Sequence, residues 1–285
     1  MIIVALITSL ILLLIIGREE IHPSWYLPKN WSNIRKVSIG YGLIWQPKKQ
    51  GILLLLIIFG LIWLTQQFYL PVPHTIVILM ICTVSLPIVW LWQAQFQYHA
   101  WEFEQITTFL QHFIAYFKSS EKVLLSLSES LGYVEGELRE VVERAIEHLK
   151  QTGDTKGAFD QITTRYPHFI VNNCQIWVAT AEQFGFEQSK EAIELLEDDI
   201  DDWIEDTMLF IRARLQMKNR ILLMCGMSAV IALFNQNLLS SFLDLHHVTV
   251  YHHVITLFLM SLNFTVLMAF RLIKGRWIAK GECIR

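Results

Sequence analysis

The sequence predicts an all-α membrane protein with about five transmembrane helices and a helical bundle between the third and the fourth of them. Hydrophobic residues make up 53% of the 285 residues, and they gather in long apolar runs separated by polar sequence. The polar stretches place apolar residues three or four positions apart, which is the spacing of amphipathic helices. No segment shows the two-residue alternation of a half-buried strand.

Five apolar runs approach or reach the length of about 20 residues that a helix needs to cross a bilayer. They are residues 1–16, 51–69, 75–92, 221–242 and 254–270. The first run lacks a preceding basic residue and a following cleavage pattern, so we expect a retained anchor rather than a signal peptide. The runs divide the chain into an N-terminal membrane region (1–93) with a loop at 17–50, a bundle domain (94–220), and a C-terminal membrane hairpin with a tail (221–285).

The distribution of positive charge predicts the orientation, because Lys and Arg stay on the cytoplasmic side of short loops. Of the 23 Lys and Arg residues, six lie within 17–50, twelve within 118–220 and five within 271–285. The short loops 70–74 and 243–253 contain none. We therefore expect the N-terminus and both short loops outside, and the central domain and the C-terminus in the cytoplasm.

The last four expected spans contain no Asp, Glu, Lys, Arg or His, and His74 lies in the loop between two of them. Ion-coupled transporters usually hold ionisable residues at membrane depth, so that class is disfavoured. Interhelical hydrogen bonds are expected from the amides Asn235, Gln236, Asn237 and Asn263. Close helix packing is expected from small residues at four-residue spacing, Cys225 with Ala229 and Ser228 with Ala232.

The central domain is expected to be a helical bundle with three apolar stripes. The first comprises Ile106, Phe109, Leu110, Phe113, Ile114 and Phe117, and the second Leu138, Val141, Val142, Ala145, Ile146 and Leu149. The third lies on a helix over 187–220 that leads directly into the fourth span, and it comprises Ile193, Leu196, Ile200, Trp203, Ile204, Met208, Ile211 and Leu215. Gly132, Gly153 and Pro167 predict breaks between helices.

The helix over 187–220 is polarised in charge. Residues 187–206 include ten acids and one base, whereas the bases Arg212, Arg214, Lys218 and Arg220 lie toward the membrane. One interpretation is a solvated helix whose charges suit the helix dipole and anionic lipid headgroups. The other is a docking surface for a basic partner, with the candidate residues Glu194, Glu197, Asp198, Asp201 and Asp202.

Motifs for catalysis and for cofactor binding are absent from the sequence. GxxxxGK[ST], HExxH, GxSxG and GxGxxG do not occur, so we expect a protein that is not an enzyme and takes no cofactor. Metal-binding atoms occur in Asp198/Asp202, in Asp201/Glu205 and in His246, His247, His252 and His253, but such groups are more often ordinary polar residues, and we assign no metal ligand. The four cysteines share no CxxC spacing. The net charge of −3, without a basic stripe, disfavours nucleic-acid binding.

Short segments of the central domain occur in an order that resembles the secretion-protein-F family, the inner-membrane platform proteins of type II secretion, type IV pili and tight-adherence pili. Residues 149–154 and 158–159 are similar to its leucine-x-x-glycine turn and the following alanine-leucine, and Tyr166-Pro167 to its phenylalanine-proline. Residues 181–185 are similar to its glycine-glutamate-x-x-glycine, with Ala181 in place of the first glycine, and 125–132 match its leucine-rich segment only in part. The motif positions with an implied structural role are Gly153, Pro167, Glu182 and Gly185.

The resemblance implies a non-catalytic, multi-pass protein of the bacterial inner (plasma) membrane that couples a cytoplasmic motor ATPase to pilin or pseudopilin subunits in pilus assembly or protein secretion. Its implied partners are that ATPase, the pilin or pseudopilin, a second copy or a homologous platform protein, and membrane lipid, but no nucleic acid. The resemblance extends to one copy of the type II secretion system F domain, as in tight-adherence systems. Two alternatives stay open: the membrane subunit of an ATP-driven exporter, and a membrane scaffold or sensor that recruits a cytoplasmic partner.

Reporter fusions test the expected orientation. Because all 23 Lys and Arg residues lie in the segments assigned to the cytoplasm, a fusion after Glu147 is expected to be active only as a cytoplasmic reporter. Fusions after Pro71 and His247 are expected to be active only as external reporters. An external signal from the fusion at Glu147 would contradict the orientation.

Overall fold

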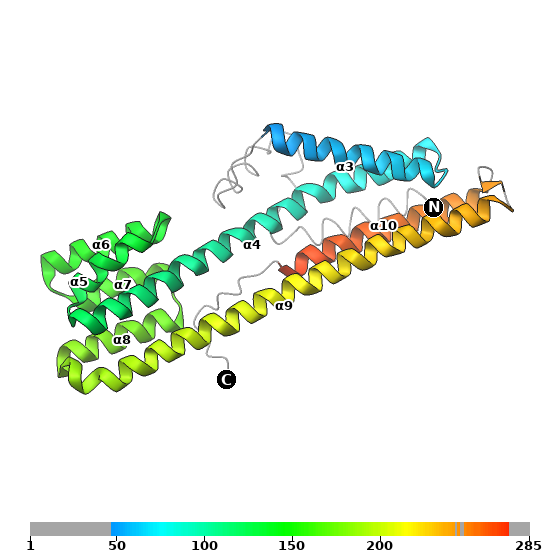
Figure 1. The fold of residues 1–285 in the computed structure, drawn as a ribbon. Coiled ribbons are helices and arrows are strands. Elements are labelled where there is room, and N and C mark those ends of the chain that lie inside the picture. The colour runs from blue at the N-terminus through cyan, green and yellow to red at the C-terminus, as the bar shows by residue number, and fades with distance from the viewer. Residues whose placement is uncertain (1–46, 243, 246–247, 274–285) are drawn as a thin grey trace. The chain divides into compact units, whose positions relative to one another are not determined.

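The computed structural model describes residues 47–242, 244–245 and 248–273, and within them the chain forms helices and short connections without any strand. The helices are α3 (Pro47–Gln67), α4 (Val72–Ser120), α5 (Val123–Ser130), the 3-10 helix η3 (Leu131–Tyr133), α6 (Gly136–Thr152), α7 (Thr155–Arg165), α8 (Phe169–Phe184), α9 (Phe186–Ser240) and α10 (Thr249–Ile273) (Figure 1). The chain divides into two units: the membrane unit, up to Tyr98 and from Arg214, and the bundle unit, His99–Ala213. The all-α prediction is confirmed for the described residues.

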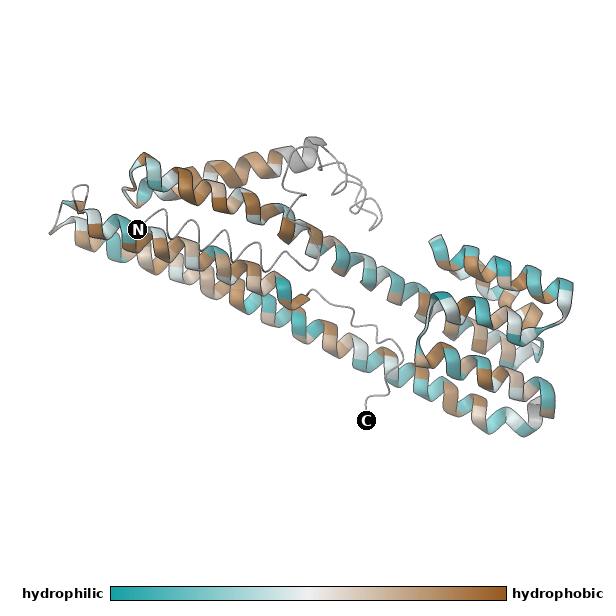
Figure 2. Ribbon diagram, turned by 180° about the vertical axis from the view of Figure 1, so that it is seen from behind, coloured by the Kyte–Doolittle hydropathy of each residue, from teal (hydrophilic) through white to brown (hydrophobic). Residues whose placement is uncertain are grey.

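Three described helices, α4, α9 and α10, are long and apolar enough to cross a membrane. Figure 2 shows the apolar residues gathered on α3, on α10 and on one part each of α4 and α9. The apolar stretch of α3, Leu54–Gln67, is shorter than these, and the first expected span lies outside the described residues. A membrane protein is therefore supported, and the number of five spans stays a prediction.

The helices of the membrane unit pack through two apolar clusters. One joins α4 to α10 and includes Trp92 and Leu267, each with 1% of its surface exposed. The other surrounds the end of α3 and includes Phe68 and Leu259, with Ala232 of α9 packed against it. Ala232 is the one of the four predicted small residues that these clusters include, and close helix packing through the small residues of the fourth span stays a prediction.

Polar side chains link the same helices across the apolar clusters. The Ser85 hydroxyl donates to Oδ1 of Asn263 at 3.1 Å, which joins α4 to α10. The Gln236 amide donates to the carbonyl oxygen of Gln67, which joins α9 to the end of α3. The interhelical bonds predicted for Gln236 and Asn263 are therefore present, whereas Asn235 and Asn237 are exposed.

The bundle unit is held together by one apolar core drawn from α4 to α9. All six residues of the predicted α4 stripe and all six of the α6 stripe are buried. On α9, Ile193, Leu196 and Ile200 are buried, but the stripe then departs from the prediction, because Met208 is 40% exposed and Thr207 is buried instead. The helical period of 3.6 residues explains this difference, since seven residues after Ile200 fall closer to the same face than eight.

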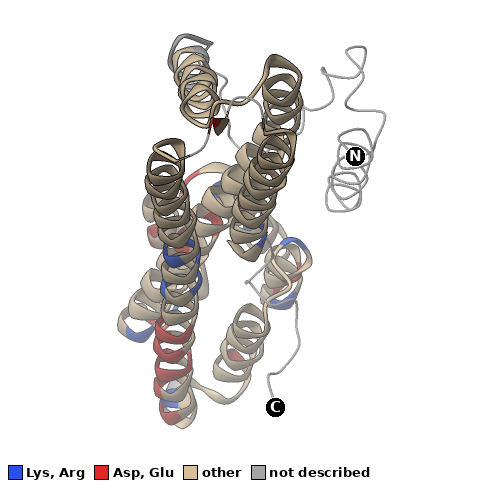
Figure 3. Cartoon of the chain, turned by 90° about the vertical axis from the view of Figure 1, so that its right-hand side faces the viewer, with Lys and Arg blue, Asp and Glu red and all other residues tan. Residues whose placement is uncertain are grey.

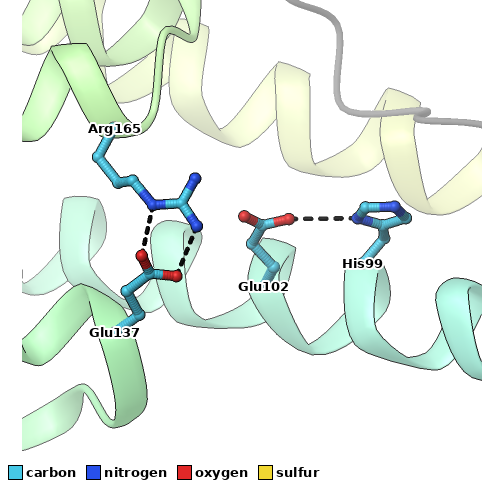
Figure 4. A network of polar contacts seen from close by, with 4 residues as sticks. All are labelled: His99, Glu102, Glu137 and Arg165. Carbon is cyan, nitrogen blue, oxygen red and sulfur yellow. Dashed lines mark hydrogen bonds and ion pairs between the residues drawn. The ribbon is translucent and has the colours of Figure 1, made fainter. Parts of the chain in front are cut away.

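A two-pronged ion pair ties the end of α7 to the first turn of α6. Nε and Nη2 of Arg165 donate to the two carboxylate oxygens of Glu137 at 2.6 and 2.5 Å, as Figure 4 shows beside the contact between His99 and Glu102 on α4. The Arg165 hydrogen bonds hold the pKa of Glu137 below its usual value. A depressed carboxyl pKa stabilises the fold at neutral pH, and this contribution disappears as the pH falls through that pKa. Both side chains are close to half exposed, so the contribution is at most about 1 kcal/mol.

The core predicts the effect of truncating Phe159, which is 1% exposed and packs edge-on against Phe113 with ring centroids 5.5 Å apart. Phe159→Ala is expected to cost about 3–5 kcal/mol of bundle stability through lost contacts and a cavity. The reporter is alkylation of the Cys174 thiol in the full-length protein, because that thiol is fully buried and burial raises its pKa to about 12. Its labelling rate should rise about a hundredfold or more. Ile176→Ala, at a 59% exposed position, is the matched control and should leave the rate nearly unchanged.

Candidate docking surface

Helix α9 holds its acidic residues away from the bundle core because three apolar residues fix its rotation. Ile193, Leu196 and Ile200 are 1–2% exposed and belong to the core. The candidate residues Glu194, Asp198, Asp201 and Asp202 are exposed, and Glu197 is half-buried beside the core. Figure 3 shows the acids, in red, gathered along one stretch of α9.

Two of the five candidates are engaged by α4. The Lys118 ammonium donates to Oε2 of Glu197 at 2.5 Å, and the Gln111 amide donates to Oδ1 of Asp201 at 3.2 Å. The hydrogen bond to Glu197 raises the pKa of Lys118, and the nearby charges of Glu194 and Asp198 add to the rise. As residue numbers fall along α4 they rise along α9, so the two helices run antiparallel in the bundle unit. Glu197 and Asp201 therefore fasten α9 to α4.

Five of the other acids form one outward strip. These residues follow one another at steps of three or four along the exposed face of α9, and we call them the acidic strip: Glu191, Glu194, Asp198, Asp202 and Glu205. Within the described part of the chain, Glu194, Asp198 and Asp202 make no hydrogen bond or ion pair. Steps of three and four keep side chains on one face of a helix. The strip therefore presents five carboxylates on one side of α9.

Three of the four motif positions lie at helix ends. Gly153 ends α6 with a φ of +69°, and its N–H donates to the carbonyl of Leu149 at 2.9 Å. Gly185 separates α8 from α9 with a φ of +95°, so both positions hold a backbone conformation that suits glycine. Pro167 lies in the connection between α7 and α8, whereas Glu182 is exposed on α8. These residues position the ends of the helices and do not belong to the acidic strip.

The described residues contain no preformed metal-binding site. No group of three His, Cys, Asp or Glu side chains among them is arranged to hold a metal ion. Asp198 and Asp202, and Asp201 and Glu205, are exposed pairs on α9. His252 and His253 lie on α10, and His246 and His247 lie outside the described residues.

The engagement of the acidic helix by α4 is a feature that the sequence analysis missed. Gln111 and Lys118 are seven residues apart, so they share one edge of the α4 stripe. A polar pair at that spacing beside an apolar stripe is the signal that predicts a flanking helix with complementary side chains. The sequence does not say which helix packs there, because the pairing joins residues about 80–90 positions apart.

Reversing the charge of Lys118 tests the fastening of α9 to α4. Lys118→Glu should lower the midpoint of thermal unfolding of the full-length protein, because it faces Glu197 and lies near Glu194 and Asp198. The loss should be about 1 kcal/mol or less, since both partners are about one-third to one-half exposed. The exchange Lys118→Glu with Glu197→Lys should restore most of it. Arg139→Glu, which breaks an exposed pair within α6, is the control and should have a smaller effect.

No family model matches the chain, and no curated protein or solved structure matches it. The family resemblance carried by residues 149–185 therefore stays an expectation from the sequence.

Proposed function

We propose that this chain is a non-catalytic inner-membrane platform protein for pilus assembly or type II-like protein secretion, which couples a cytoplasmic motor ATPase to pilin or pseudopilin subunits. The observation that carries the proposal is α9, one helix of 55 residues without a break. It bears the acidic strip near its start and an apolar stretch at 221–234 further along. The helix continues from the bundle unit into the membrane unit, so no loop separates the acidic strip from the apolar stretch.

The acidic strip supports the proposed contact with a motor ATPase. Five exposed carboxylates of one sign create a local field that steers a basic surface into contact. Exposed charges are screened beyond about 8–10 Å at physiological ionic strength, so docking of this kind weakens with added salt. A motor domain with a basic face is the partner that this chemistry recognises.

The apolar face of α9 supports the proposed contact with pilin or pseudopilin subunits. In the most apolar 18-residue stretch of this helix, only 6% of the residues are buried within the described part of the chain. Large apolar side chains are exposed along it, namely Leu223, Met224, Met227, Val230, Ile231 and Phe234. An apolar face without ionisable residues suits either lipid or the apolar helix of a membrane-held subunit. We also place association with a second copy or a homologous chain on this face, because Ala232 on the small-residue face already packs within the chain.

Charge reversal of the acidic strip tests the motor contact. The variant Glu194→Lys, Asp198→Lys, Asp202→Lys keeps Glu197 and Asp201 as the partners of α4. The new lysines at 194 and 198 repel Lys118, but these positions are exposed, so the loss should be about 1 kcal/mol or less and the bundle should still fold. We expect assembled pili or secreted protein to fall at least tenfold, while membrane abundance of the variant stays within twofold of the wild type. Copurification of the motor ATPase should fall in parallel, and for the wild type it should weaken as salt is added.

A matched variant separates a local effect from a change in net charge. Glu129, Glu140 and Glu147 are exposed acids on α5 and α6. Their joint replacement by Lys changes the charge by the same amount and should leave assembly intact. Normal assembly by an abundant acidic-strip variant would end the docking proposal and leave α9 a structural strut.

A further inference from the structure

Three histidines from two helices meet within the membrane unit, where α4 begins and α10 begins. The ring of His74 lies 5.2 Å from the ring of His253 and 5.9 Å from that of His252, measured between centroids. His74 is 4% exposed and His252 is 7% exposed. His253 is half-buried, and its Nδ1 is a buried atom without a hydrogen-bond partner in the described part of the chain.

A hydrogen bond joins His74 on α4 to Thr256 on α10. Thr256, which is 3% exposed, donates its hydroxyl proton to the carbonyl oxygen of His252 at 2.7 Å. Nδ1 of His74 lies 2.8 Å from the same hydroxyl oxygen. The Thr256 hydroxyl therefore lies within hydrogen-bond distance of both groups, and its contact with His74 ties the start of α4 to the start of α10.

Carboxylates that would balance an added proton are scarce around this cluster. The titratable groups on the packed helices are His74 on α4, Tyr251, His252 and His253 on α10, and Tyr69 after α3. Helix α9 presents the amide of Gln236 at this end. The one carboxylate in residues 47–98 and 214–273 is Asp244, which is exposed in the α9–α10 connection.

We propose that His74, His252 and His253 form a proton-sensitive latch, which holds the starts of α4 and α10 together while the rings are neutral and releases them when the surrounding solution becomes acidic. Imidazole is the side chain that titrates between pH 5 and 8. Neutral rings pack as aromatic surfaces, whereas charged rings 5–6 Å apart repel one another and are poorly solvated at buried positions. The latch belongs to the membrane unit and does not depend on what the acidic strip binds.

Hydrogen exchange of the full-length protein in lipid nanodiscs tests the latch. After correction for the intrinsic pH dependence of exchange, amides of residues 70–78 and 248–256 should exchange at least tenfold faster at pH 5.5 than at pH 7.5. Amides of the bundle unit serve as the internal reference and should change less than twofold. The variant His74→Gln, His252→Gln, His253→Gln cannot titrate at these positions and should show no pH response there, and His112→Gln, in the bundle unit, should behave as the wild type.

Two further measurements on the wild-type protein test the latch without the triple variant. Nuclear magnetic resonance of histidine-labelled wild type should show the rings of the cluster taking up protons over the pH range in which exchange accelerates. Equal exchange of the wild type at both pH values would overturn the latch. So would opening at pH 7.5 on addition of a chelator together with protection by Zn²⁺, because that result would mean that the histidines hold a metal ion.

Discussion

The burial of one apolar stripe of α9 against the bundle core is the interaction on which the rest of the bundle unit depends. Ile193, Leu196 and Ile200 are almost completely buried, and each buried side chain of this kind is worth about 1.5–3 kcal/mol. The ion pair between Lys118 and Glu197 is partly exposed and is worth about 1 kcal/mol at most. The apolar residues therefore set the rotation of α9, and the charges take the positions that this rotation leaves to them.

The membrane unit follows a different rule, because lipid tails are as apolar as the helices that they surround. Apolar contacts alone then give little preference for one helix neighbour over another. Side-chain hydrogen bonds supply this preference, between Ser85 and Asn263 and between His74 and Thr256. Each is worth about 0.6–2 kcal/mol in a membrane. Spans that hold almost no charge can therefore still pack in one arrangement.

Periodicity predicted much of the bundle unit, and its limits have physical causes. The α4 and α6 stripes follow from local spacing, because every member shares one face of one helix. The breaks at Gly153 and Pro167 follow from backbone preferences that belong to those residues. Pairing between helices is not local, so neither the contact of Lys118 with Glu197 nor the meeting of His74 with His253 was predicted. For the same reason, the sequence alone does not distinguish the acids that contact α4, Glu197 and Asp201, from those of the acidic strip.

The helix dipole does not account for the acidic strip. Its field acts within the first turn of a helix, and α9 begins at Phe186, so Glu194 already lies more than two turns beyond the helix start. Acids four residues apart, such as Glu194 with Asp198 and Asp198 with Asp202, repel by about 0.2–0.5 kcal/mol per pair. A helix that needed only solubility would interleave both signs, because a Lys four residues after an acid stabilises a helix instead. The burial of the apolar stripe of α9 outweighs this repulsion, so the helix still packs on the bundle. A contact with a basic partner would explain why the sequence keeps mutually repelling acids on the exposed face of α9.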